Sequence, residues 1–143
     1  MRDIYNSLCS SVGQYKAYVK IDFDTFIDKK YLHGVFSFLS KNHEKYLYFG
    51  DPMHYFFNRR LVMNGKLYAF SSAVLKEYCN CNSYKVWDHR EDFWFGKTMA
   101  HCFLDNDAYN NKTMNNFKSD ESKIFHKSFN RDGISMKMGF QRR

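Results

Sequence analysis

Two pairs of acidic residues have the types and spacing that could do chemistry. Asp22 and Asp24 directly follow an apolar run that is typical of a buried strand, and Glu91 and Asp92 open a stretch that is typical of a helix. Carboxylate oxygens are the ligands that Mg²⁺ or Mn²⁺ prefers, so the first pair predicts a metal site. A carboxylate of the second pair can act as a general base. Holding a metal-bound diphosphate and deprotonating a nucleophile are the two tasks of sugar transfer from a nucleotide.

Both pairs also have an ordinary structural explanation. Asp-x-Asp is common in loops, and acidic residues in the first turn of a helix interact favourably with the helix dipole. The chemical interpretation of these four carboxylates therefore depends on the elements that hold them.

Strands and helices are expected to alternate along the chain. Apolar runs predict strands over 14–21, 45–50 and 66–71, and apolar stripes predict helices over 28–40, from 71 to 78 and from 91 to 103. A loop or edge segment is expected over 51–64, and a polar connection over 79–89. This order favours an α/β fold, in which residues at the carboxyl ends of strands, such as Asp22, face the ligand crevice.

Composition bounds the class of protein. The 143 residues are enough for one domain with a sizeable core, and a hydrophobic content of 44% excludes disorder of the whole chain. The net charge of +7 suits an anionic partner, but the basic residues are scattered and form no run typical of a nucleic-acid patch. No signal peptide or membrane anchor is recognisable, so the sequence as it stands predicts a soluble chain.

The four cysteines, Cys9, Cys79, Cys81 and Cys102, lack the spacing of a zinc site. Their even number permits two disulfides in three possible connectivities, and the sequence does not choose among them. Beyond residue 104, asparagines and aspartates predict a solvated segment, which a short apolar piece at 124–126 interrupts.

Several segments follow one another in an order known from an enzyme family. Residues 20–26 read Lys-x-Asp-x-Asp-x-Phe, and the expected helix over 31–40 and a strand over 46–50 that ends in glycine come next. Residues 65–71 are similar to a Gly-x-Gly-Tyr-x-x-Ser strand, and 91–96 are similar to a Glu-Asp-Val-x-x-Gly motif. Together they resemble the β1,3-glycosyltransferases that share the galactosyltransferase domain. These include β1,3-galactosyltransferases, β1,3-N-acetylglucosaminyltransferases and the more distant fringe-like enzymes.

The resemblance implies a GT-A-type, Rossmann-like fold and a metal-dependent transfer of galactose or N-acetylglucosamine from a UDP-sugar. It implies that Asp24 is a direct ligand of Mn²⁺ or Mg²⁺, that Asp22 holds the ribose or a metal-bound water, and that His126 completes the metal site. It also places Lys20 and Gly65 in the donor-binding site.

On the acceptor side, the resemblance implies that Asp92 is the general base and that Glu91 orients the loop or the sugar. The acceptor would be a glycan of a glycoprotein or glycolipid. Transfer would invert the anomeric configuration of the sugar and form a β1,3 linkage. Members of the family work at Golgi membranes.

The sequence departs from the family in three places. Phe23 replaces a middle acidic residue, Leu67 replaces a glycine, and only 21 residues precede Asp22, where the family has a substantial stretch. The resemblance therefore implies that residues 1–104 are the C-terminal part of a catalytic domain, and that 105–143 form its Asn-rich loop and basic C-terminal extension.

Two other functions stay open on the sequence alone. An inactive transferase-like fragment could serve as a binding or chaperone-like subunit, although it would have no need to keep Asp22, Asp24 and Asp92. A basic nucleic-acid module would show strongly salt-dependent binding, but it leaves the ordered motifs unexplained.

Overall fold

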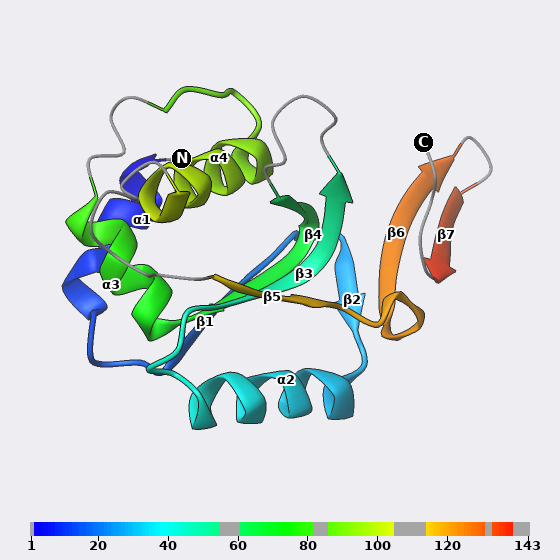
Figure 1. The fold of residues 1–143 in the computed structure, drawn as a ribbon. Coiled ribbons are helices and arrows are strands. Elements are labelled where there is room, and N and C mark those ends of the chain that lie inside the picture. The colour runs from blue at the N-terminus through cyan, green and yellow to red at the C-terminus, as the bar shows by residue number, and fades with distance from the viewer. Residues whose placement is uncertain (1, 55–60, 82–85, 105–113, 131–132, 139–143) are drawn as a thin grey trace.

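A four-stranded mixed sheet in the order β1–β4–β3–β5 forms the centre of the fold (Figure 1). The computed structural model describes residues 2–54, 61–81, 86–104, 114–130 and 133–138. The central strands are β1 (Ala17–Ile21), β3 (Leu47–His54), β4 (Leu61–Ser71) and β5 (Asn115–Lys118). β1 and β3 each pair antiparallel with β4, whereas β5 runs parallel to β3. The mixed sheet that we predicted for an α/β fold is therefore confirmed.

A second, smaller sheet stands beside the first and is entirely antiparallel. Its order is β2–β6–β7, formed by β2 (Thr25–Ile27), β6 (Ile124–Asn130) and β7 (Gly133–Met138). The short 3₁₀ helix η3 (Glu121–Lys123) leads into β6. Because β2 follows β1 after a tight turn, residues 22–24 connect the two sheets.

Helices cover both faces of the central sheet (Figure 1). α1 (Arg2–Leu8), α3 (Ser72–Asn80) and α4 (Glu91–Leu104) lie on one face, and α2 (Lys29–Lys41) lies on the other. α2 forms as predicted, because Asp28 caps it by accepting a hydrogen bond from the Tyr31 amide at 2.8 Å. Its apolar stripe buries Val35 and Leu39 against the sheet.

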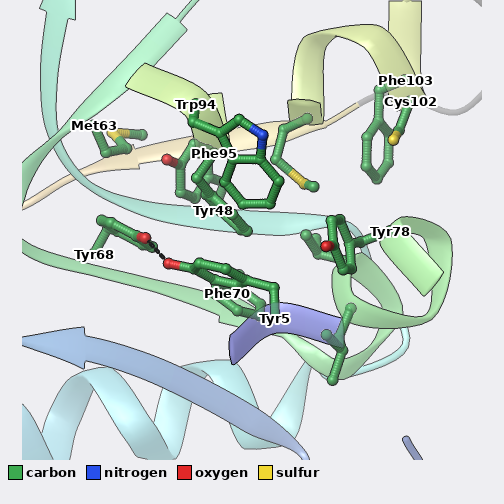
Figure 2. Packing of buried hydrophobic residues seen from close by; sticks show 13 residues of the cluster. Tyr5, Tyr48, Met63, Tyr68, Phe70, Tyr78, Trp94, Phe95, Cys102 and Phe103 are labelled. Carbon is green, nitrogen blue, oxygen red and sulfur yellow. Dashed lines mark hydrogen bonds between the residues drawn. The ribbon is translucent and has the colours of Figure 1, made fainter. Parts of the chain in front are cut away.

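The larger core cluster lies between the sheet and α1, α3 and α4, and it is rich in aromatic rings (Figure 2). Phe95 of α4 stacks on Tyr68 and on Phe70 of β4, with ring centroids 5.1 Å apart in both pairs. Tyr5 of α1 stacks on the same Phe95 at 4.8 Å. The aromatic rings of this cluster therefore serve packing.

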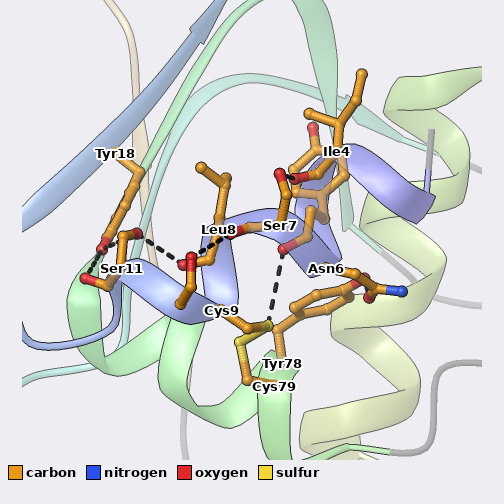
Figure 3. The surroundings of a disulfide bond; sticks show 11 residues. Ile4, Asn6, Ser7, Leu8, Cys9, Ser11, Tyr18, Tyr78 and Cys79 are labelled. Carbon is orange, nitrogen blue, oxygen red and sulfur yellow. Dashed lines mark hydrogen bonds between the residues drawn. A yellow bond between two sulfur atoms is a disulfide. The ribbon is translucent and has the colours of Figure 1, made fainter.

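Two disulfides connect the helices on this face. Cys9, in the 3₁₀ helix η1 (Cys9–Ser11), is bonded to Cys79 of α3 (Figure 3), and Cys81 is bonded to Cys102 of α4. All four cysteines are paired. The structure thus selects one of the three connectivities that the sequence left open.

Several predicted boundaries are wrong. The expected loop or edge segment over 51–64 contains the last residues of β3 and the first residues of β4, because β3 continues through an irregularity between Gly50 and Pro52. A proline is tolerated at such a bulge, where no ladder donor is required. The polar connection begins later than predicted, since α3 continues to Asn80.

The strands after residue 114 are a further difference from the prediction. β5 falls within the stretch that we expected to be solvated, and its four side chains are exposed. A polar, exposed strand lacks the apolar alternation that sequence patterns detect, so only its pairing with β3 defines it. The asparagines at 106, 110 and 111 lie outside the described residues.

Candidate functional site

The predicted acidic pair lies in a tight turn at the carboxyl end of β1. The Asp22 amide donates to the Lys66 carbonyl at 3.0 Å, and the Thr25 amide donates to the Asp22 carbonyl at 3.0 Å. These bonds close the turn and start β2. Phe23 is 95% exposed at its tip, whereas the carboxylates on either side are half-buried. The two aspartates therefore emerge where the central sheet meets the smaller one.

Asp24 lies next to His126, which belongs to the neighbouring strand of the smaller sheet. Thr25 of β2 is the register partner of His126 of β6, which brings the residue before Thr25 close to the imidazole. The Asp24 Oδ2 and His126 Nε2 atoms are 3.3 Å apart. The contact joins residues that are far apart in the sequence, and it exists only because β6 pairs with β2.

Lys20 connects the acidic turn to the start of α4. Its ammonium donates to Asp22 Oδ1 at 2.5 Å and to the Gly65 carbonyl at 2.6 Å, and it forms an ion pair with Glu91 Oε2 at 3.1 Å. Burial alone lowers the pKa of Lys20, but the hydrogen bond to Asp22 and the charge of Glu91 outweigh it and raise the pKa above its ordinary value. Lys20 is therefore a permanent cation among carboxylates.

Glu91 is held from the opposite side by two phenols. The hydroxyls of Tyr5 and Tyr68 both donate to its Oε1 atom, and they also contact each other (Figure 2 shows the two tyrosines). Burial raises the pKa of each phenol, and the negative charge of Glu91 raises it further. Both hydroxyls therefore stay protonated as donors, and Glu91 is satisfied by three neighbouring side chains.

Asp92 has a different environment from its neighbour. Its Oδ1 accepts the Phe93 amide at 2.9 Å, while its Oδ2 lies against Gly65. A Cβ added at Gly65 would come within 3.3 Å of Asp92 Oδ2 and 3.4 Å of Lys20 Nζ. The missing side chain at Gly65 thus lets β4 approach both charged groups closely.

The segment before α4 fixes the direction in which these two acidic residues point. Asp88 Oδ1 accepts the Arg90 amide at 3.0 Å, and its Oδ2 accepts the Lys97 ammonium at 2.6 Å. Burial alone raises the pKa of Asp88, but the bonds from Lys97 and Arg90 outweigh it and hold the pKa well below its ordinary value. An ionised Asp88 therefore ties the entry of α4 to its second turn.

Asp24 and His126 have the separation that two neighbouring ligands of one cation require. Ligands at the bond lengths of an octahedral Mg²⁺-like ion lie about 3 Å apart when they are adjacent. Such ions commonly take only one or two protein side chains and complete their shell with water and substrate phosphates. Among the residues that the structure describes, no group of three His, Cys, Asp or Glu is placed to hold a metal. The Oδ1 atom of Asp22 is paired with Lys20 instead.

The predicted site residues are therefore arranged in two groups that share the acidic turn. Asp22, Lys20, Gly65, Glu91 and Asp92 form the first group, and Asp24 with His126 forms the second.

Sequence reasoning missed the role of two tyrosines as partners of Glu91. The only available signal was that a buried tyrosine usually seeks a partner for its hydroxyl, and nothing in the sequence named Glu91 as that partner. Tyr5 precedes it by 86 positions and belongs to a different helix.

Comparison of the sequence with protein-family models gives no match, and neither does comparison with curated proteins. In the part of the chain that the structure describes, no helix has both the length and the apolar character to cross a membrane.

Proposed function

We propose that this chain is part of a catalytic domain of the GT-A type. The domain would transfer galactose or N-acetylglucosamine from a UDP-sugar to a glycan, inverting the anomeric configuration and forming a β1,3 linkage. The observation that carries the proposal is the contact of Lys20 with both Asp22 and Glu91. It brings the end of β1, which carries the acidic turn, to the start of α4, which carries Asp92. A donor site and a general base are thus supplied by adjoining elements.

The charge of the site supports the need for a cation. Four carboxylates adjoin the turn and the start of α4, and Lys20 is the cation that contacts two of them. A diphosphate would be repelled by such a surface unless a positive ion lay between them. Asp24 and His126 would hold Mn²⁺ or Mg²⁺, which would neutralise the charge that develops on the departing UDP.

Asp92 is the better candidate for the base of the two residues that open α4. Glu91 has both carboxylate oxygens engaged, by Lys20 and by the two phenols. Asp92 has one oxygen bound to a backbone amide, which orients the carboxylate, and the other beside Gly65. That second oxygen would take the proton from the acceptor hydroxyl while the hydroxyl oxygen attacks the sugar.

The disulfides support a compartment of the secretory pathway, in line with Golgi glycosylation. Disulfides persist in oxidising compartments and are rare in the cytosol. All four cysteines are paired, and both bonds lie on the face of the sheet that α4 covers.

Replacement of Asp24 by asparagine tests the metal assignment. We expect the variant to lose the increase in UDP affinity that Mn²⁺ produces, because the charge of a direct ligand is removed without a change in size. Isothermal titration with UDP, at several Mn²⁺ concentrations, measures this. Asp28→Asn is the matched control, since it removes one charge nearby and asparagine still caps α2. Equal dependence on Mn²⁺ in both variants would contradict the assignment.

Replacement of Gly65 by alanine tests the placement of Asp92. The new Cβ, 3.3 Å from Asp92 Oδ2, would push the carboxylate by a few tenths of an ångström. We expect kcat to fall about tenfold, because displacements well below 1 Å already disturb reacting groups. UDP-sugar turnover with a glycan acceptor measures it.

The matched control is Gly34→Ala in α2. Nothing lies within 4 Å of the added Cβ, so activity should be unchanged and the free energy of unfolding should rise by about 1 kcal/mol. If kcat were the same in the Gly65 and Gly34 variants, Asp92 would not need its observed position.

A further inference from the structure

A continuous chain of contacts runs from the first helix to the acidic turn. The Tyr5 hydroxyl of α1 donates to Glu91 of α4, Glu91 pairs with Lys20 of β1, and Lys20 pairs with Asp22. Tyr68 of β4 joins the chain at Glu91. We call these five residues the tyrosine–carboxylate network.

The central members of this network are bonded on every polar atom. Lys20 has three protons, which its partners Asp22, Gly65 and Glu91 match. Each oxygen of Glu91 is engaged, one by Lys20 and the other by the two phenols. Loss of the Tyr5 hydroxyl would therefore leave Glu91 Oε1 with the Tyr68 hydroxyl as its remaining phenol donor, in a half-buried site. Such a loss is costly enough for the neighbouring groups to move.

The ring and the hydroxyl of Tyr5 have different contacts. The ring stacks on Phe95 at 4.8 Å and approaches Trp94 at 5.4 Å, and a phenylalanine would make the same contacts. The hydroxyl reaches Glu91, which begins the same helix. Packing alone therefore does not require a tyrosine, whereas the contact with Glu91 does.

We propose that Tyr5 is a positioning residue of the transfer site: its hydroxyl holds Glu91, and Glu91 in turn fixes Lys20 and Asp22 at the donor side of the acidic turn. This inference rests on the proposed function and deepens it. The 3₁₀ helix η1, which directly follows α1, is bonded to α3 by Cys9–Cys79 (Figure 3), so the end of the helix that supplies Tyr5 adjoins a covalent anchor. Correct docking of α1 is thereby coupled to the geometry of the carboxylates.

The test compares Tyr5→Phe with Tyr78→Phe. Tyr78 belongs to the same aromatic cluster, and its hydroxyl also contacts α1, donating to Asn6 Oδ1 at 2.8 Å, but Tyr78 is not part of the network. Turnover of the UDP-sugar gives kcat and KM. An activity-independent readout is the rate at which acetic anhydride modifies Lys20, measured by peptide mass spectrometry.

In Tyr5→Phe we expect kcat to fall about tenfold, the lower end of the effect of removing a group that orients a ligand. Lys20 should react several-fold faster, because its carboxylate partner is no longer held. Tyr78→Phe should change neither quantity. In the double variant Tyr5→Phe/Glu91→Gln, kcat should equal that of Glu91→Gln alone, because Tyr5 acts through Glu91.

The outcomes separate this inference from the proposed function. If the wild-type chain transfers sugar and the Tyr5→Phe effects are no larger than those of Tyr78→Phe, or simply add to those of Glu91→Gln, the positioning role is wrong. A Tyr5→Phe chain that fails to fold, when Tyr78→Phe folds, would also overturn it, since the hydroxyl would then be structural. If the wild type neither binds UDP nor transfers sugar, the proposed function fails, and Lys20 reactivity alone decides whether Tyr5 positions the network.

Discussion

Asp92→Asn is expected to lower kcat for sugar transfer by about 10²–10⁴-fold, the contribution of a positioned general base. Asparagine keeps the size of the side chain and can still accept the Phe93 amide, so α4 should begin as before. The UDP affinity should stay within a small factor of the wild-type value, because Asp92 is assigned to the acceptor and not to the donor. Turnover and isothermal titration together separate the two quantities.

Two results would contradict this role of Asp92. A large loss of UDP affinity with a small loss of kcat would make Asp92 a donor-binding or structural residue. Equal UDP binding without turnover in both the wild type and the variant would favour the non-catalytic alternative, a transferase-like binding subunit. Donor affinity thus needs to be measured alongside kcat.

Removal of the Cys9–Cys79 bond is expected to have the largest effect on stability. The bond spans 70 positions and Cys81–Cys102 spans 21, so the chain-entropy model assigns about 4 kcal/mol to the first and about 3 kcal/mol to the second. Either loss is a large part of the 5–15 kcal/mol that stabilises a typical domain. Denaturant unfolding of the Cys9→Ser/Cys79→Ser and Cys81→Ser/Cys102→Ser double variants measures the two free energies.

The same pair of variants also probes the docking of α1. The Cys9/Cys79 variant should lose activity beyond its loss of stability, since of the two disulfides that bond is the one that adjoins the helix carrying Tyr5. The Cys81/Cys102 variant, assayed in its folded state, should retain the Tyr5 contact. Reversed stabilities, or equal activities at equal folded fraction, would show that the first disulfide is not the anchor of α1.

Local signals in the sequence predicted the elements that depend on local interactions. The cap at Asp28 and the stripe of α2 lie within one short segment, so the helix could be predicted there. The end of β1 at Ile21 and the start of α4 at Glu91 were predicted for similar reasons. These boundaries determine where the carboxylates lie along the chain. The sequence therefore predicts which element carries each carboxylate, but not the contacts between elements.

Features that depend on distant pairing were not predictable in this way. β5 is polar and exposed and is defined only by its pairing with β3. The separation of 3.3 Å between Asp24 and His126 follows from the register of β2 and β6, which no local pattern encodes.

The measurement that tests the central claim most directly is titration of the folded wild-type chain with UDP, with and without Mn²⁺. The acidic turn next to His126 predicts binding that requires the cation, because the carboxylates otherwise repel the diphosphate. Binding of equal affinity without Mn²⁺, or the absence of binding by a chain shown to be folded, would contradict the assignment of a metal-dependent UDP-sugar site.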